Sequence, residues 1–241
     1  MNIKYILESK QGFIRESNQD HADTLATKDG FLAVICDGVG GNNGGETASK
    51  LAVNSIIESF KQSSEFEIED RLTMAITYAN RKIKEEALKT PFLKGMATTV
   101  VVLFYDGTTA TWAYAGDSRL YLYQPGLLTQ LTKDHSLLQE MLDRGLITPE
   151  ETHNFPLKNI ITKALGEKDQ LEIDVGRLNL EFTDGSKFFL CTDGVSGLLS
   201  GDEIEWLLGM EDLSVIDAEL TRLVEEKGAT DNFTYIIISN K

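Results

Sequence analysis

The sequence predicts an α+β fold in which antiparallel sheets are covered on the outside by helices. Two long segments repeat apolar residues at every third or fourth position, which is typical of amphipathic helices. Several shorter runs, rich in branched and aromatic side chains, have the length and composition of strands. Strands and helices cluster along the chain instead of alternating strictly, and this favours antiparallel sheets with helices packed outside them.

The composition is that of a globular chain with a strong negative charge. The chain has 241 residues, of which 41% are hydrophobic, and its net charge is −15. This length suffices for one domain with a real core, and no linker, repeat or low-complexity segment divides residues 1–241. The negative charge repels nucleic acid and anionic membranes, so neither is expected as a partner.

The cysteines and the N-terminal residues indicate the cellular compartment in which we expect the protein. Cys36 and Cys191 lie inside predicted strands and are interpreted as small buried hydrophobes, so no disulfide framework is implied. The N-terminus alternates like a strand and lacks the apolar core of a signal peptide, and no apolar run approaches transmembrane length. We expect a cytoplasmic protein, with a monomer as the default state.

The first half of the chain contains two predicted strands and two predicted helices. Residues 2–8 are predicted to form a strand, and residues 9–20 a loop that carries Arg15 and Asp20. The short apolar run 31–36 predicts a buried strand. One helix begins at about Glu46 and another spans about 68–88, because apolar residues recur there at helical spacing; both apolar faces are interpreted as core-facing.

From residue 98 the apolar period changes to two. Residues 98–105, 108–115 and 120–123 are predicted to form a three-stranded meander, and 128–131 a short further strand. Residues 136–158 are less regular, with a helix that ends near Gly145 and a short one that opens at Pro149. Because this stretch interrupts the strands, it is a candidate flap over the substrate. The remaining predictions are strands near 171–178, 187–192 and 233–238, and helices near 202–208 and 214–226.

Four aspartates border apolar runs at widely separated places. They are Asp37 after the run 31–36, Asp193 after 187–192, Asp231 before 235–238, and Asp117 between 111–115 and 120–123. A single Asp-Gly is best explained by a turn. Four carboxylates at strand ends instead indicate a hard-metal site with oxygen ligands, because a buried carboxylate is costly without a cation. The glycines after Asp37 would leave backbone carbonyls open to the same ion.

Nine short motifs in order add up to a family resemblance. They are RESNQD (15–20), DGVGG (37–41), GETAS (45–49), MATT (96–99), AGDSR (115–119), LTKDHS (131–136), ITKALG (161–166), CTDGV (191–195) and DNFT (231–234). Together they resemble the bacterial PPM/PP2C-type metal-dependent serine/threonine protein phosphatases, from Arg15 to Thr234. The resemblance implies a four-layer α/β/β/α sandwich with two Mn²⁺ or Mg²⁺ ions at one end of its two sheets.

The resemblance also implies roles for individual residues. Asp37 would bridge both metals, with the Gly38 carbonyl and Asp20 on one side and with Asp193 and Asp231 on the other. Asp117 and Asp193 would hold a third, weaker ion, and Arg15 would bind the phosphate. Arg15, Asp37 and Asp193 are thus the implied catalytic residues. Gln19 stands where many members have Glu, and Val39 where animal members have a histidine proposed as general acid, which leaves a metal-bound water as a candidate for that role.

The implied activity is hydrolysis of phosphoserine and phosphothreonine in proteins, reversing the action of a bacterial serine/threonine kinase. Two divalent ions can hold and acidify one water and place it in line with phosphorus. The guanidinium of Arg15 can grip two phosphate oxygens as a fork, a geometry that lysine lacks. The substrate proteins would be the products of a partner kinase.

Other classes fail on particular residues or stay open. A cysteine phosphatase needs an arginine six places after its cysteine, but Asn42 and Gly197 stand there. A nucleotide-binding P-loop nearly appears at residues 40–47, yet Glu46 occupies the place of the phosphate-holding lysine. The alternatives that remain are a non-catalytic phosphoprotein-binding module with a structural metal site and another metal-dependent phosphoester hydrolase.

Three further residues near the motifs have ordinary explanations. Thr98 and Thr99 fit a strand as well as a site, and His135 is interpreted as a structural, hydrogen-bonding histidine rather than a proton donor.

Overall fold

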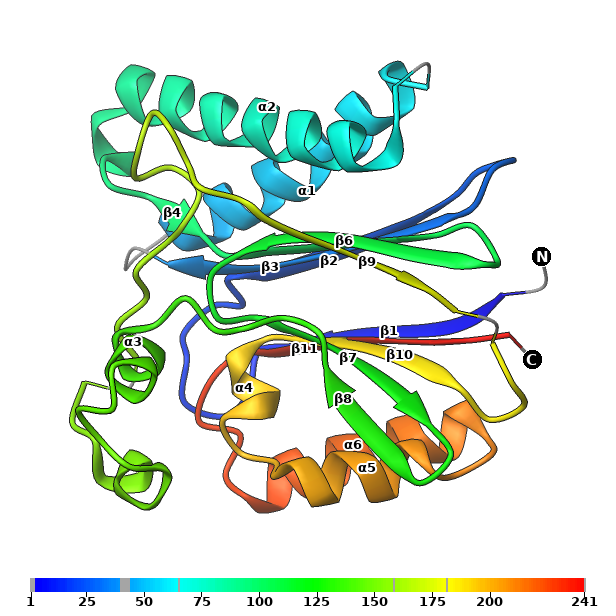
Figure 1. The fold of residues 1–241 in the computed structure, drawn as a ribbon. Coiled ribbons are helices and arrows are strands. Elements are labelled where there is room, and N and C mark those ends of the chain that lie inside the picture. The colour runs from blue at the N-terminus through cyan, green and yellow to red at the C-terminus, as the bar shows by residue number, and fades with distance from the viewer. Residues whose placement is uncertain (1–2, 40–43, 65, 158, 181, 241) are drawn as a thin grey trace.

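Two antiparallel sheets pack face to face, and helices cover both outer faces (Figure 1). The computed structural model describes residues 3–39, 44–64, 66–157, 159–180 and 182–240. Its layers follow the order helix, sheet, sheet, helix, so the predicted α/β/β/α sandwich is confirmed.

One sheet has the strand order β1-β11-β10-β7-β8, and the other has the order β2-β3-β5-β6-β9 with β4 paired to β3. The strands of the first sheet are β1 (Lys4–Lys10), β11 (Phe233–Ser239), β10 (Lys187–Cys191), β7 (Arg119–Gln124) and β8 (Leu127–Gln130). Those of the second are β2 (Asp20–Ala26), β3 (Phe31–Val39), β4 (Ala97–Thr98), β5 (Val100–Tyr105), β6 (Thr109–Ala115) and β9 (Asp174–Asn179).

Helices form the two outer layers and the segment at one end of the sheets. The layer over β3 and β5 consists of α1 (Gly44–Gln62) and α2 (Ile68–Lys89), and the layer over β10 and β11 consists of α4 (Asp193–Ser196), α5 (Gly201–Leu208) and α6 (Leu213–Glu226). The remaining helical pieces are η1 (Pro91–Leu93), α3 (Leu137–Asp143) and η2 (Pro149–Asn154). No helix among the described residues is long and apolar enough to cross a membrane.

The alternation of side chains along each strand divides the interior into three cores. From β3, Leu32, Val34 and Cys36 pack under α1 and α2, whereas Phe31, Ala33 and Ile35 pack between the sheets. Residues of β10 and β11 alternate in the same way between the inter-sheet core and the core under α5 and α6. This period of two is what lets one strand join two layers. Cys36 and Cys191 are buried and unpaired, as predicted.

The strongly periodic elements were predicted within a few residues. The two long helices, the C-terminal helices and the strands near 187–192 and 233–238 are all present. The two short helices predicted in 136–158 correspond to α3 and η2.

The strand β2 is missing from the prediction, which placed residues 9–20 in a loop. Ser9 and Lys10 complete β1, and Asp20 is already the first residue of β2. The segment 20–26 carries few large apolar side chains, because β2 is the edge strand of its sheet and packs along only one neighbour.

The strand predicted at 31–36 continues to Val39, because Gly38 and Val39 pair with Thr98 and Ala97 of β4. Asp37 therefore lies within a strand rather than at the start of a turn. Gly40 and Gly41, whose backbone carbonyls were expected to be open to the ion, lie outside the described residues.

The predicted three-stranded meander is wrong in its third strand. β5 and β6 pair with each other, but β7 pairs with β10 and β8 in the other sheet. The link at Gly116–Ser118 therefore crosses from one sheet to the other instead of closing a hairpin. An Asp-containing turn between two apolar runs looks the same in the sequence in both cases, because β10, the partner that joins β7 to the rest of its sheet, lies far along the chain.

Replacing Phe188 with alanine is expected to destabilise the fold strongly. Phe188 is fully buried between the sheets and packs against Tyr105 and Phe182. Truncating a buried phenylalanine costs about 3–5 kcal/mol, because a cavity remains. Urea unfolding followed by circular dichroism measures the loss. Phe66→Ala is the matched control, since Phe66 is 50% exposed and should cost less than about 1 kcal/mol. Similar losses for both variants would contradict this account of the inter-sheet core.

Candidate active site

An acidic cleft lies where the ends of both sheets meet. Its volume is about 860 Å³, and of the predicted site residues it is lined by Arg15, Asp37, Gly38, Asp117, Asp193 and Asp231. Asp20, the remaining predicted site residue, stands beside the cleft, opposite Asp37 in the β2–β3 register. In Figure 1 the elements that carry these residues converge between β4 and α3, at the edge away from both chain termini. The structure thus brings together residues that lie up to 216 positions apart in the sequence.

Two threonines fix the main chain of Asp37. Its backbone N–H donates to Thr99 Oγ1 at 2.9 Å, and its carbonyl accepts from Thr98 Oγ1 at 2.8 Å. Thr99 Oγ1 in turn shares a hydrogen bond of 2.7 Å with Ser118 Oγ. Both threonines are fully buried, so they hold Asp37 at the cleft without lining it themselves.

A hydroxyl group of the opposite sheet holds Asp20. Thr192, directly after β10, donates from Oγ1 to Asp20 Oδ2 at 2.8 Å. Asp20 is only 5% exposed, and its second oxygen, Oδ1, accepts no hydrogen bond from the described residues. This contact therefore ties β2 of one sheet to the end of β10 in the other, beside the carboxylate cluster.

Asp193 and Asp117 complete the cluster from two further segments. Asp193 opens α4 after its N-cap residue Thr192, and the negative charge of Asp193 raises the pKa of Asp37. Asp117 comes from the crossing between β6 and β7, where Gly116 has a φ of +117° that suits glycine.

The crowding of these acids raises their pKa values. Burial is the largest cause at all four, and the negative charge of Asp193 raises the pKa of Asp20, Asp37 and Asp117 further. The pKa values of Asp20 and Asp117 each rise to about 7, and that of Asp37 lies well above its usual range. The metal-free cluster therefore binds protons to relieve its own repulsion.

The oxygens of this cluster fit a divalent cation. In the described part of the chain, three buried carboxylate oxygens lack any hydrogen-bond partner: Oδ1 of Asp20, of Asp117 and of Asp193. Such oxygens suit Mg²⁺ or Mn²⁺, and a cation beside them would lower the raised pKa values. As they stand in this structure, no three acidic, histidine or cysteine side chains of the described residues are arranged to hold a metal ion.

Arg15 lines the same cleft as Asp37, Asp117 and Asp193 and is paired with Asp231. Its Nη2 donates to Asp231 Oδ2 at 2.6 Å, and this bond raises the pKa of the guanidinium. About half of the Arg15 side chain is exposed, so the ion pair is itself worth little to stability. Its significance is positional, because it keeps a forked cation beside the carboxylates.

Asn232 anchors the loop that carries Arg15. Its side-chain Nδ2 donates to the carbonyls of Gln11 and Ser17 at 2.7 and 2.9 Å, and its Oδ1 accepts from the backbone N–H of Gln19 at 2.9 Å. One amide thus uses three hydrogen bonds to close the loop 11–19 onto the start of β11. Sequence reasoning missed this role, although the Asp-Asn pair inside the last motif was its visible signal.

His135 is structural, as predicted. Its Nδ1 accepts from the backbone N–H of Gly116 at 3.1 Å, so its Nε2 carries the proton and donates to Asp174 Oδ2 at 3.0 Å. The ring also stacks on Tyr114. With both nitrogens engaged, His135 supports the crossing that carries Asp117.

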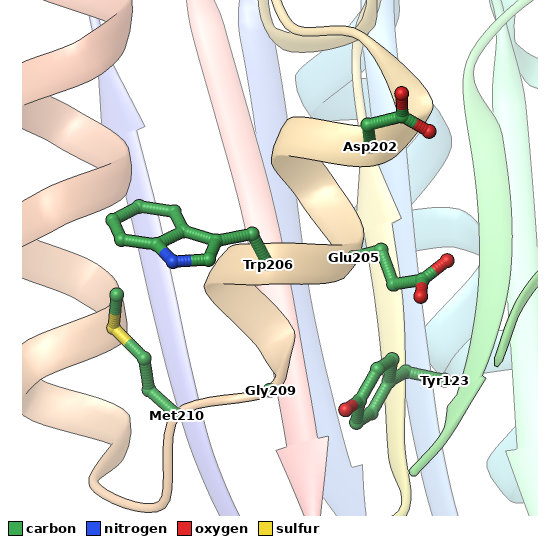
Figure 2. Close-up of a pocket in the computed structure, with 6 residues that line it drawn as sticks. All are labelled: Tyr123, Asp202, Glu205, Trp206, Gly209 and Met210. Atoms are coloured by element: carbon green, nitrogen blue, oxygen red, sulfur yellow. The ribbon is translucent and has the colours of Figure 1, made fainter. Parts of the chain in front are cut away.

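A separate hollow of about 570 Å³ lies on the outer face of α5 and shares no lining residue with the acidic cleft. It is lined by Tyr123, Asp202, Glu205, Trp206, Gly209 and Met210 (Figure 2). Glu205 and Trp206 leave α5 on opposite sides, so acidic and apolar groups do not converge there. The described lining includes no cation that could bind a phosphate.

The fold and the acidic cleft together define a class of protein. Clustered carboxylates with unpaired oxygens, faced by one arginine at the seam of two sheets, suit a metal-dependent enzyme that acts on a phosphate ester.

Comparison with known proteins gives the family. The family described as Protein phosphatase 2C matches residues 15–231. The serine/threonine phosphatase stp of Listeria welshimeri is 34% identical over 95% of this chain and 92% of its own length. The serine/threonine phosphatase of S. agalactiae has a solved structure with a TM-score of 0.92 at 30% identity, covering 99% of this chain and 100% of that one.

A further solved structure contains metal. It is the catalytic domain of the serine/threonine protein phosphatase PstP in complex with two manganese ions, and it matches with a TM-score of 0.86 at 29% identity over 98% of this chain and 97% of that one. The chain belongs to the protein phosphatase 2C family, a family of metal-dependent enzymes, and is a PP2C-type protein-serine/threonine phosphatase. The resemblance identified from the motifs is thereby confirmed.

Replacing Asp117 with asparagine is expected to stabilise the metal-free protein at pH 8. Because the pKa of Asp117 rises from 3.8 to about 7 on folding, its charged form opposes folding at high pH, and this penalty shrinks as pH falls toward 4. We expect a gain of about 1–2 kcal/mol at pH 8 and a smaller gain at pH 5. Urea unfolding in the presence of a chelator measures both.

The control for this prediction is Asp202→Asn, since Asp202 is exposed on α5 and should give no gain. Equal stability of wild type and Asp117→Asn at pH 8 would show that the cleft does not penalise this charge.

Proposed function

We propose that the chain hydrolyses phosphoserine and phosphothreonine in proteins through a divalent-metal centre built on its acidic cleft. The observation that carries the proposal is the cluster of four crowded carboxyl groups, three of them with an unpaired oxygen, faced by Arg15. We further propose that residues 1–241 act as one catalytic domain, with 136–158 as a flap beside the cleft.

The cluster offers a ligand set for two ions. Asp37 is the bridging ligand of the proposal, because Asp20 faces it across the β2–β3 ladder and the charges of both Asp20 and Asp193 raise its pKa. The Gly38 carbonyl and Asp20 would serve one ion, and Asp193 and Asp231 the other. When bound, Mn²⁺ or Mg²⁺ ions would lower the pKa of the attacking water and neutralise charge on the phosphate oxygens.

A third, weaker ion is proposed between Asp117 and Asp193. The charge of Asp193 raises the pKa of Asp117, which places the two carboxyl groups within electrostatic reach of each other. Oδ1 of each lacks a hydrogen-bond partner among the described residues. These two acids are therefore suited to share a cation.

Arg15 is the proposed phosphate-binding residue. Its guanidinium already lies beside the carboxylates through Asp231, and Asn232 keeps its loop in place. A forked donor can hold two phosphate oxygens and stabilise the charge that grows on them as the ester bond breaks. It thereby orients phosphorus toward the carboxylate cluster.

Hydrolysis forms a bond from the water oxygen to phosphorus and breaks the bond from phosphorus to the serine or threonine oxygen, which must gain a proton. No histidine lines the cleft among its described residues, and Val39 stands at the position where animal relatives have the proposed acid. We propose that this proton comes from water in the open cleft.

The proposed substrates are proteins phosphorylated by a serine/threonine kinase. The net charge of −15 disfavours nucleic acid and anionic membranes as partners. We propose that the protein acts as a monomer in the cytoplasm.

Phosphate release from a phosphothreonine peptide is expected to require Mn²⁺ and Asp193. Wild type should lose activity after chelation and regain it when Mn²⁺ is restored. Asp193→Asn should lower kcat/KM at least about 100-fold, because one proposed ligand charge is lost from the centre. Malachite-green detection of phosphate measures both. A folded wild type that binds Mn²⁺ yet releases no phosphate would favour the phosphoprotein-binding alternative.

Replacing Arg15 with lysine is expected to lower kcat/KM about 10- to 100-fold. Lysine keeps the positive charge but cannot hold two oxygens in the planar fork. The same peptide assay, with Mn²⁺ held constant, measures the loss. Arg81→Lys is the matched control, since Arg81 is an exposed arginine on α2 with an ion pair of its own. Full activity of Arg15→Lys would contradict the proposal that the guanidinium of Arg15 binds two phosphate oxygens.

A further inference from the structure

Exposed apolar side chains are among the residues that line the acidic cleft. Ile14 is 68% exposed, Phe92 is 66% exposed and Val39 is 37% exposed, and all three line the cleft together with partly buried Ile161. We call these four residues the apolar rim. Single exposed apolar side chains are ordinary, but several gathered around one opening mark a binding surface.

Four separate segments deliver the apolar rim. Ile14 comes from the loop between β1 and β2, Val39 from the end of β3, Phe92 from η1, and Ile161 from the chain after η2. No single amphipathic element can account for this convergence, because the four positions belong to different helices, strands and loops. The exposed apolar surface is therefore a property of the cleft itself.

The backbone around each rim residue is fixed by hydrogen bonds or burial. These contacts are the pairing of Val39 with Ala97, the bridge of Ile161 to Ser136, the burial of Leu93 beside Phe92, and the bond of 2.9 Å from the Phe13 N–H to the Ala229 carbonyl beside Ile14. The apolar side chains are thus presented on ordered backbone. A rigid apolar surface loses little entropy when it binds another apolar group.

The charges inside the rim are almost all negative. Among the described residues that line the cleft, Arg15 is the one cation, against the acids Glu16, Asp37, Asp117, Asp193 and Asp231. Arg15 and bound cations can compensate a phosphate at the centre. An acidic side chain next to that phosphate would meet further negative charge and no second arginine or lysine of the described lining.

The neighbouring cleft over α4 shares Asp117, Asn159 and Asp193 with the acidic cleft. Its remaining described lining combines polar and charged residues, among them the cations Arg119 and Lys227, with three leucines. This second cleft therefore offers two cations beside its apolar side chains, whereas the described lining of the acidic cleft offers only Arg15.

We propose that the apolar rim selects phosphoserine and phosphothreonine segments that carry bulky apolar side chains within two residues of the phosphorylated position. This inference rests on the proposed function and goes beyond it by naming the substrate class. An apolar neighbour of the phosphorylated residue loses water contact against Phe92 and Ile14, whereas a polar neighbour gains no partner there. Burial of one such side chain is worth about tenfold in kcat/KM.

The experiment compares two phosphothreonine peptides of equal length and net charge. In one peptide, the two residues before and the two residues after the phosphothreonine are leucine. In the other peptide, the same four residues are glutamine. With wild type and saturating Mn²⁺, kcat/KM should be at least about tenfold higher for the leucine peptide. Phe92→Ala and Ile14→Ala should each reduce this ratio to about two- to threefold, and Phe92→Leu should retain most of it.

The matched control is Met74→Ala. Met74 is 43% exposed on α2 and lies outside the cleft, so its removal should leave the ratio between the two peptides unchanged. Measuring a ratio within each variant separates peptide selection from general damage to the centre, which would lower both rates together.

The outcomes distinguish this inference from the proposed function. If wild type hydrolyses neither peptide nor para-nitrophenyl phosphate with Mn²⁺, the proposed function itself fails. If wild type hydrolyses both peptides equally well, or prefers glutamine, the role of the apolar rim is overturned while the phosphatase activity stands. If the preference exists but survives both Phe92→Ala and Ile14→Ala, the selecting surface lies elsewhere.

Discussion

The repulsion among the clustered carboxyl groups is the constraint on which the rest of the site depends. Burial raises the pKa of Asp37, and the charges of Asp20 and Asp193 raise it further, so the metal-free cluster is costly at neutral pH. The fold holds it with hydroxyl groups, from Thr98 and Thr99 at the Asp37 main chain and from Thr192 at the Asp20 carboxylate. The packing of the three cores stabilises the fold enough to offset this repulsion. A bound cation would replace the repulsion with attraction between the cation and the carboxylates.

The cluster exists because two sheets end at the same edge. Asp20 and Asp37 come from one sheet, Asp193 and Asp231 border strands of the other, and Asp117 lies on the chain that crosses between them. At that crossing a Cβ on Gly116 would lie 2.6 Å from the Thr99 side chain, so the crossing passes tightly against the support of Asp37. The packing of the sheets therefore sets the spacing of the acids.

The sequence predicted what depends on local pattern and missed what depends on pairing. Helical periodicity identified both long helices. The aspartates at the ends of apolar runs predicted a cluster, and the structure brings them to one cleft because strands of packed sheets end together. The edge strand β2 escaped because it lacks an apolar run, and β7 was assigned to the wrong sheet because its partner β10 is distant in sequence. The hydrogen bond from Thr192 to Asp20 joins residues 172 positions apart, and neither segment alone contains a pattern that predicts it.

Asn232 shows how the site joins its two kinds of group. Asp231 and Asn232 are consecutive. Asp231 pairs with Arg15, and Asn232 closes the loop of Arg15 with three hydrogen bonds. The strand β1, which precedes this loop, pairs with β11 along its length, so the loop begins beside the strand that Asn232 precedes. The cation for the phosphate and a carboxylate of the cluster are thus parts of one interlocked unit, and a shift of either would move the other. The position of the phosphate relative to the attacking water therefore depends on Arg15, Asp231 and Asn232 as much as on the other acids.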